Sequence, residues 1–362
     1  MPGARRQRVR AFLSEELRQL TTIQASDRAW QMPMAAALSS GLPLVAAAAL
    51  GRIGDGLVAS LGGLVFLYLP ATSLARRMVA LLACAFAMLA CYTLGMVSGL
   101  WPPAIVPALV AITVLVMTTS RIYALGPPGG LFFVMAAAIG AYSPLTAADL
   151  PRMAGLIGFG SLLACTVGFF YSIFMLRRHA PAPQPPLPAF AFDYMVLDAV
   201  VIGAAVGVSL LAAHALALDK PYWVPVSCLA VIQGASLRAV WNRQLQRVLG
   251  TGAGVALAWG LLSLPLSGWS VALMVTLLTF LIEMLVVRHY ALATVLITPL
   301  TILLADAATL GHAAPAALVQ ARFFDTLLGC AIGLAGGWCL HSPRLRASAG
   351  AWLRRLAPQR TR

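Results

Sequence analysis

Charge is scarce in this sequence. Only 10% of its 362 residues are Asp, Glu, Lys or Arg, whereas a soluble domain carries roughly 25%. Apolar residues make up 60% of the chain, and runs such as 78–98 and 268–287 lack the apolar–polar alternation of a barrel strand. These absences exclude a soluble globular protein and a membrane β-barrel. They predict an all-α polytopic membrane protein, because helices satisfy their own backbone groups in lipid.

Groupings of residues that carry enzymatic or metal chemistry are also missing. The sequence has no nucleotide-binding loop, no His-x3-His pair and no Ser/His/Asp grouping. Its six cysteines lie in or beside apolar segments and form no Cys-x-x-Cys pair. We therefore expect no enzymatic activity, no cofactor, no metal and no disulfide. The cysteines are Cys84, Cys91, Cys165, Cys228, Cys330 and Cys339.

Lysine is almost absent, since Lys220 is the single lysine among 25 basic residues. The net charge of +14 comes from arginines beside the ends of apolar segments, as the positive-inside rule requires. This distribution favours contact with anionic lipid and argues against a nucleic-acid site.

The apolar segments predict about twelve membrane helices in two sets of six. Segments of ~20 apolar residues are long enough to span a bilayer, although 56–70 and 222–237 are short for a full crossing. The first set lies near 31–50, 56–70, 77–98, 101–120, 129–145 and 153–176, and the second near 195–217, 222–237, 246–264, 268–287, 289–305 and 323–340.

The chain accordingly divides into five parts. A basic, amphipathic N-terminal segment, 1–29, precedes the first six-span half, 30–176. A proline-rich linker, 177–194, leads to the second half, 195–340, and a basic tail, 341–362, follows. With both termini cytoplasmic, 21 basic residues fall on the cytoplasmic side and 4 on the outer side.

The two halves resemble each other in sequence. Arg121-Ile-Tyr-Ala-Leu125 matches Arg288-His-Tyr-Ala-Leu292 at an offset of 167 positions. Arg152 and Arg322, each expected to open a glycine-rich last span, are 170 apart. Six spans per half return the chain to its starting side, so we expect two parallel repeats, as in several transporter folds.

One stretch of the second half carries an ordered motif. Trp223 opens a short span, and Arg243 and Arg247 follow in a basic stretch expected to form a cytoplasmic turn. Gly250 and Gly254 have the spacing of closely packed membrane helices. The motif comprises Trp223, Arg243, Arg247, Gly250, Thr251 and Gly254.

These residues resemble the signature of the fusaric acid resistance protein-like (FUSC) family of membrane transporters. Further family-like patches contain Glu283 with Tyr290, and Arg322 with Thr326 and Gly329. The resemblance covers 195–340 well and 30–176 more weakly. It implies export of small organic anions, such as aromatic carboxylic acids, across a bacterial inner membrane. Some family members work with a periplasmic adaptor. This chain departs from the family's best-known members by lacking a large soluble domain.

Ionisable residues inside apolar spans are the candidates for a transport pathway, because each costs ~2.5–3.5 kcal/mol to insert. Glu283 is expected to lie deep in its span and to carry a proton, or else to pair with an arginine from another span or to cap a neighbouring helix. Arg322 and Asp325, three residues apart, are expected to pair at the outer interface or to line the pathway. Arg288 is expected to guide anions on the cytoplasmic side, and Asp306 lies near a span end.

The sequence thus predicts an inner-membrane exporter of small organic anions, coupled to protons. A passive organic-anion channel and a non-transporting scaffold for an efflux adaptor are the alternatives. The expected partners are the anion, protons, the lipid bilayer and, as open possibilities, a periplasmic adaptor or further copies of the chain.

Overall fold

The computed structural model describes residues 18, 22–26, 28–143, 146–184, 186–306 and 315–348, without the side chains of 193, 305, 306 and 315. All regular elements in these ranges are helical. The predicted N-terminal amphipathic helix and the end of the basic tail fall largely outside them. The helices of the first half are α2 (Gln31–Ala49), α3 (Ile53–Gly63), α4 (Leu74–Gly99), α5 (Ile105–Ile122), α6 (Leu131–Ala141) and α7 (Leu150–Leu176). Those of the second half are α8 (Asp198–Ala215), α9 (Trp223–Ile232), α10 (Leu237–Leu262), α11 (Gly268–Leu285), α12 (Tyr290–Asp306) and α13 (Pro315–His341).

Many of these helices are long and apolar enough to cross a membrane. Within the described ranges, eight of them meet that requirement, while four apolar helices are shorter. The short ones are Ile53–Tyr68, in which the 3-10 turn η1 (Leu64–Tyr68) continues α3, Leu131–Ala141, Trp223–Ile232 and Tyr290–Leu304. The all-α membrane architecture is thus confirmed, whereas twelve full crossings stay a prediction.

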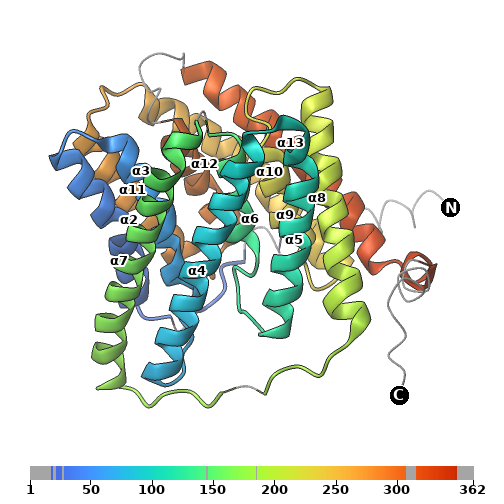
Figure 1. The fold of residues 1–362 in the computed structure, drawn as a ribbon, viewed down its shortest axis with the longest axis horizontal. Helices are drawn as coiled ribbons and strands as arrows, with labels where there is room; N and C mark the ends of the chain where they lie inside the picture. The colour runs from blue at the N-terminus through green and yellow to red at the C-terminus, as the bar shows by residue number, and fades with distance from the viewer. Residues whose placement is uncertain are drawn as a thin grey trace.

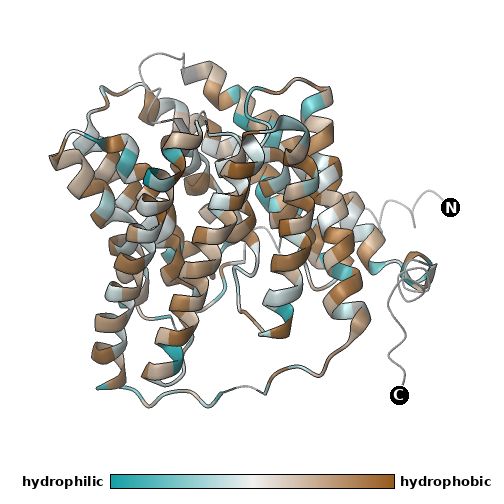
Figure 2. Ribbon diagram, viewed as in Figure 1, coloured by the Kyte–Doolittle hydropathy of each residue, from teal (hydrophilic) through white to brown (hydrophobic). Residues whose placement is uncertain are grey.

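Apolar side chains cover the outside of the helices as well as the core. Phe86, Leu115 and Phe170 are more than 60% exposed, which is the arrangement expected of helices that face lipid. Figure 2 shows hydrophobic colours along most of the helix lengths in that view. The exposed surface therefore fits a bilayer and would be insoluble in water.

The helices of each half pack in the same pairs. In the first half α4 packs against α6 and α7, and α3 packs against α7. In the second half α10 packs against α12 and α13, and α9 packs against α13. The two halves meet most extensively where α2 packs on α11 and where α5 packs on α8. The helix numbers of corresponding pairs differ by six. For example, the pair α4 and α6 in the first half corresponds to the pair α10 and α12 in the second.

The linker between the halves follows its proline content. It is non-helical over the described residues between Leu176 and Ala191, because successive prolines remove backbone donors and clash with the preceding helical turn. Figure 1 shows it running along the lower edge from the end of α7 to the beginning of α8.

Two helices of the second half begin earlier than the sequence indicated. The span predicted at 246–264 is α10, which starts at Leu237, so Arg243 and Arg247 lie on the helix and not in a turn. Ser236 caps this helix by accepting a hydrogen bond from the backbone N–H of Ala239 at 3.2 Å. The span predicted at 323–340 is α13, which starts at Pro315. Arg322 therefore lies two turns inside the last helix and does not open it.

Candidate anion-binding site

Arg247 contacts several helices of the second half. It lies on α10 and is only 5% exposed. Its Nη1 donates to the hydroxyl of Tyr290, the first residue of α12, at 3.0 Å. Its Nη2 donates to Oγ of Ser227 on α9 at 3.4 Å. One guanidinium thus joins α9, α10 and α12.

A second buried arginine lies beside this one. Arg322 of α13 is 4% exposed, and its Cζ lies 4.1 Å from the ring centre of Trp223 at the start of α9. An arginine stacked on an indole face gains a cation–π attraction that strengthens when water is excluded. Arg247 lies near enough for its positive charge to act on Arg322.

One carboxylate accompanies the two arginines. Asp325 lies one turn beyond Arg322 on the same face of α13 and is 1% exposed. We call Trp223, Ser227, Arg247, Tyr290, Arg322 and Asp325 together the buried arginine site.

Several polar atoms in the buried arginine site have no hydrogen-bond partner among the described residues. They are Nε of Arg247, Nε and Nη1 of Arg322, and Oδ2 of Asp325. An unsatisfied buried donor costs about 1–3 kcal/mol, and more when it is charged. Two cations face one carboxylate, so the site has excess positive charge and free donors. A carboxylate or another small oxyanion would satisfy both.

The other motif residues lie around the buried arginine site. Gly250 and Gly254 of α10 face α12, where a Cβ on Gly254 would lie 2.6 Å from the backbone oxygen of Val295. Thr251 is buried in the same helix. Arg243 lies at the rim, with its Cζ 5.0 Å from the ring centre of Tyr290. The motif predicted from sequence and the later patches at Tyr290 and Arg322 therefore converge in space.

Glu283 lies elsewhere in the second half. It is near the end of α11, and its Oε2 pairs with Nη1 of Arg28 at 3.1 Å. The expected partner from another segment thus exists, although Arg28 precedes α2 and is not within a span. Arg288 is half-buried after α11, and its backbone oxygen accepts from the amide of Gln24 at 2.9 Å. The side chain of Asp306 lies outside the described residues.

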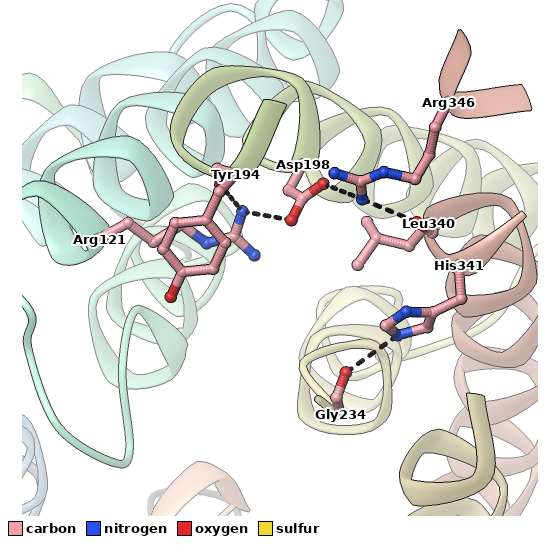
Figure 3. Close-up of polar contacts among 7 residues, drawn as sticks. All are labelled: Arg121, Tyr194, Asp198, Gly234, Leu340, His341 and Arg346. Atoms are coloured by element: carbon pink, nitrogen blue, oxygen red, sulfur yellow. Dashed lines mark hydrogen bonds and ion pairs between the residues drawn. The ribbon is translucent and has the colours of Figure 1, made fainter. Parts of the chain in front are cut away.

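Asp198 forms a charged cluster that the sequence did not reveal. Its Oδ2 lies 3.0 Å from Nη1 of Arg121 on α5, and its Oδ1 lies 2.6 Å from Nη1 of Arg346 after α13. Figure 3 shows both arginines directed at the carboxylate, with the ring of Tyr194 beside Arg121 at 4.8 Å. Asp198 lies at the start of α8 and is only 5% exposed. Nothing in the local sequence marks partners that are 77 and 148 positions away.

Comparison with known proteins identifies the part of the chain that holds the buried arginine site. Residues 199–336 match the fusaric acid resistance protein-like family. The second half of the chain is FUSC-like. This FUSC-like half contains every residue of the buried arginine site.

A bacterial relative is also a membrane protein. A stretch of 149 residues is 32% identical to the uncharacterized membrane protein YvaC of Bacillus subtilis (strain 168). The stretch covers 40% of this chain and 24% of the relative, so the match spans about a quarter of the relative's length. No solved structure matches the chain. The chain is a multi-pass membrane protein with a FUSC-like half.

Proposed function

We propose that this protein is an inner-membrane transporter that exports small organic anions, with aromatic and related carboxylic acids as the substrate class. The observation that carries the proposal is the buried arginine site. A protein that only spans a membrane gains nothing from two cations and unpaired donors in its interior, because each costs free energy to insert. A transported anion would bind to these cations and donors and so explain why they are present.

The arrangement of the helices supports the same proposal. If the two halves are parallel repeats, the short helices occupy corresponding positions, since α3 corresponds to α9 and α6 to α12. In transporters, short or interrupted spans at corresponding positions of two repeats mark the binding site. Two short helices, α9 and α12, contribute Trp223, Ser227 and Tyr290 to the buried arginine site.

Proton coupling belongs to this proposal, with Glu283 as a candidate carrier. Arg28 holds the Glu283 carboxylate in this conformation. Separation of that pair during transport would free the carboxylate to accept a proton. We expect Glu283→Gln to abolish proton movement that depends on added carboxylic acid.

The test is flux in proteoliposomes that contain the full-length protein. Labelled benzoate and aliphatic carboxylates are offered with and without a pH gradient, and internal pH is followed in parallel. Arg247→Gln and Arg322→Gln should each lower benzoate flux at least tenfold, because each removes a cation that binds the anion. Arg178→Gln is the matched control, since it removes an exposed arginine at the end of α7 and should leave flux unchanged.

Three results would count against the proposal. Wild-type flux in both the Arg247 and the Arg322 variants would show that the buried arginine site is not on the pathway. An absence of flux for every anion, with folded wild-type protein, would favour a membrane scaffold. Currents that follow voltage and ignore the pH gradient would replace the coupled exporter by a passive channel.

A further inference from the structure

Asp325 differs from the other buried carboxylates of the protein. Asp198 and Glu283 are each held by arginines in ion pairs of 2.6–3.1 Å. Asp325 is buried more deeply, yet its Oδ2 has no hydrogen-bond partner in the described part of the chain. Arg322 lies one turn away, and two of its donors also lack partners among the described residues.

A carboxylate in this position is costly unless the charge itself is needed. Burial of an unpaired charge is among the largest penalties in a folded protein. An Asn or Ser would fill the same space at a smaller cost in free energy. The charges that act on Asp325 are those of Arg322 on its own helix and of Asp219, an exposed residue before α9. The charges of Arg247 and Asp325 act in turn on Arg322.

Starting from the proposed function, we infer that Asp325 is a built-in counter-anion that limits how tightly the buried arginine site holds a carboxylate. The Asp325 carboxylate and an entering anion are both attracted to Arg322 and repel each other. The repulsion raises the free energy of the bound state and speeds release of the anion. Without Asp325, two arginines in a dry site would retain the anion and turnover would fall.

This role makes Asp325 a residue that sets affinity, and it predicts opposite changes in binding and turnover. Two like charges within one buried site repel strongly enough to weaken binding on the order of tenfold or more. Asp325→Asn should therefore bind benzoate at least tenfold more tightly than the wild type. In proteoliposomes the same variant should show a lower KM together with a lower maximal rate. A residue that only supports folding would lower the rate without improving affinity.

The experiment is equilibrium dialysis of labelled benzoate against full-length protein in lipid nanodiscs. Fluorescence of Trp223, isolated by subtracting the signal of Trp223→Phe, gives an independent reading because that ring contacts Arg322. Asp219→Asn is the matched control, because it removes a nearby negative charge that water screens, and it should change affinity less than twofold. Asp325→Glu keeps the charge and should remain within a few-fold of the wild type.

Failure of the inference and failure of the proposed function give different results. If Arg322→Gln loses benzoate binding while folded Asp325→Asn binds no more tightly than the wild type, the inference is overturned and the proposed function stands. If neither the wild type nor Asp325→Asn binds any tested carboxylate, the proposed function fails and the inference fails with it. If Asp325→Asn does not fold, Asp325→Glu with unchanged affinity and Asp325→Ser with raised affinity support the role, and equal affinities overturn it.

Discussion

The buried arginines combine two demands at the scale of single residues. Arg247 is fixed by neutral acceptors, the hydroxyls of Ser227 and Tyr290, and not by a carboxylate. A neutral acceptor orients a guanidinium without cancelling its charge, so the cation stays available to a ligand. Arg322 is positioned in a comparable way by the face of Trp223. The site is thus oriented and still positively charged.

Removal of the Tyr290 hydroxyl tests whether the position of Arg247 depends on it. Tyr290→Phe leaves Nη1 of Arg247 without its acceptor, and we expect about 1–3 kcal/mol of destabilisation. Ser227→Ala should cost less, because its hydrogen bond is long at 3.4 Å. Thermal unfolding of both variants in the same detergent measures the difference. Equal midpoints for Tyr290→Phe and the wild type would show that the hydroxyl does not position Arg247.

At the scale of elements, the contact between α10 and α12 depends on small residues in the motif. Hydrophobic association is weak between helices in lipid, so close backbone approach and van der Waals contact supply the attraction. Gly250 and Gly254 allow that approach, since a Cβ at either position would meet a backbone oxygen of α12 at 2.6 Å. This contact holds Arg247 beside Tyr290.

Two glycine substitutions on the same helix test the contact. Gly254→Ala should push α12 away and cost about 1–3 kcal/mol, the usual range for overpacking. Gly260→Ala is the control, because a Cβ there meets nothing within 4 Å, and it should be neutral or stabilise by up to ~1 kcal/mol. Unfolding midpoints and the anion affinity of each variant are the measurements. A Gly254→Ala protein that equals Gly260→Ala in both would refute the close-contact argument.

At the scale of the whole molecule, one ion pair lies at each of the two larger contacts between the halves. Arg28, before α2, pairs with Glu283 near the end of α11. Arg121, near the end of α5, pairs with Asp198 at the start of α8. In both contacts the arginine precedes the linker and the acidic partner lies on the second half. If the halves move relative to each other during transport, these pairs must separate and form again.

A charge swap tests whether Arg28 and Glu283 join the halves. Arg28→Glu should destabilise the protein by roughly 1–3 kcal/mol, between the values for surface pairs and buried pairs. Glu283→Arg should act in the same direction, and the double variant should recover most of the loss. A double-mutant cycle of unfolding free energies gives the coupling directly. Additive losses with no recovery would mean that the pair does not hold the halves together.

The sequence predicted the helical character, the approximate helix positions and the motif whose residues meet in the second half. Apolar run length and composition decide these features locally, as does the small-residue spacing of Gly250 and Gly254. Partners distant in sequence were not predictable. Arg28 for Glu283, and Arg121 with Arg346 for Asp198, are selected by helix packing. The depth of Arg322 in its helix was also missed, because hydropathy underestimates the length of a helix whose first turns are less apolar.

The short helix α9 has an electrical consequence. Its 10 residues extend about 15 Å, half of a hydrocarbon core of about 30 Å. If water reaches both ends of α9, the membrane voltage falls over a shorter distance. Arg247 and Arg322 would lie within that narrow field. A charge that crosses the whole field changes its energy by ~2.3 kcal/mol per 100 mV. Movement of an anion past these arginines would therefore be driven directly by the membrane voltage.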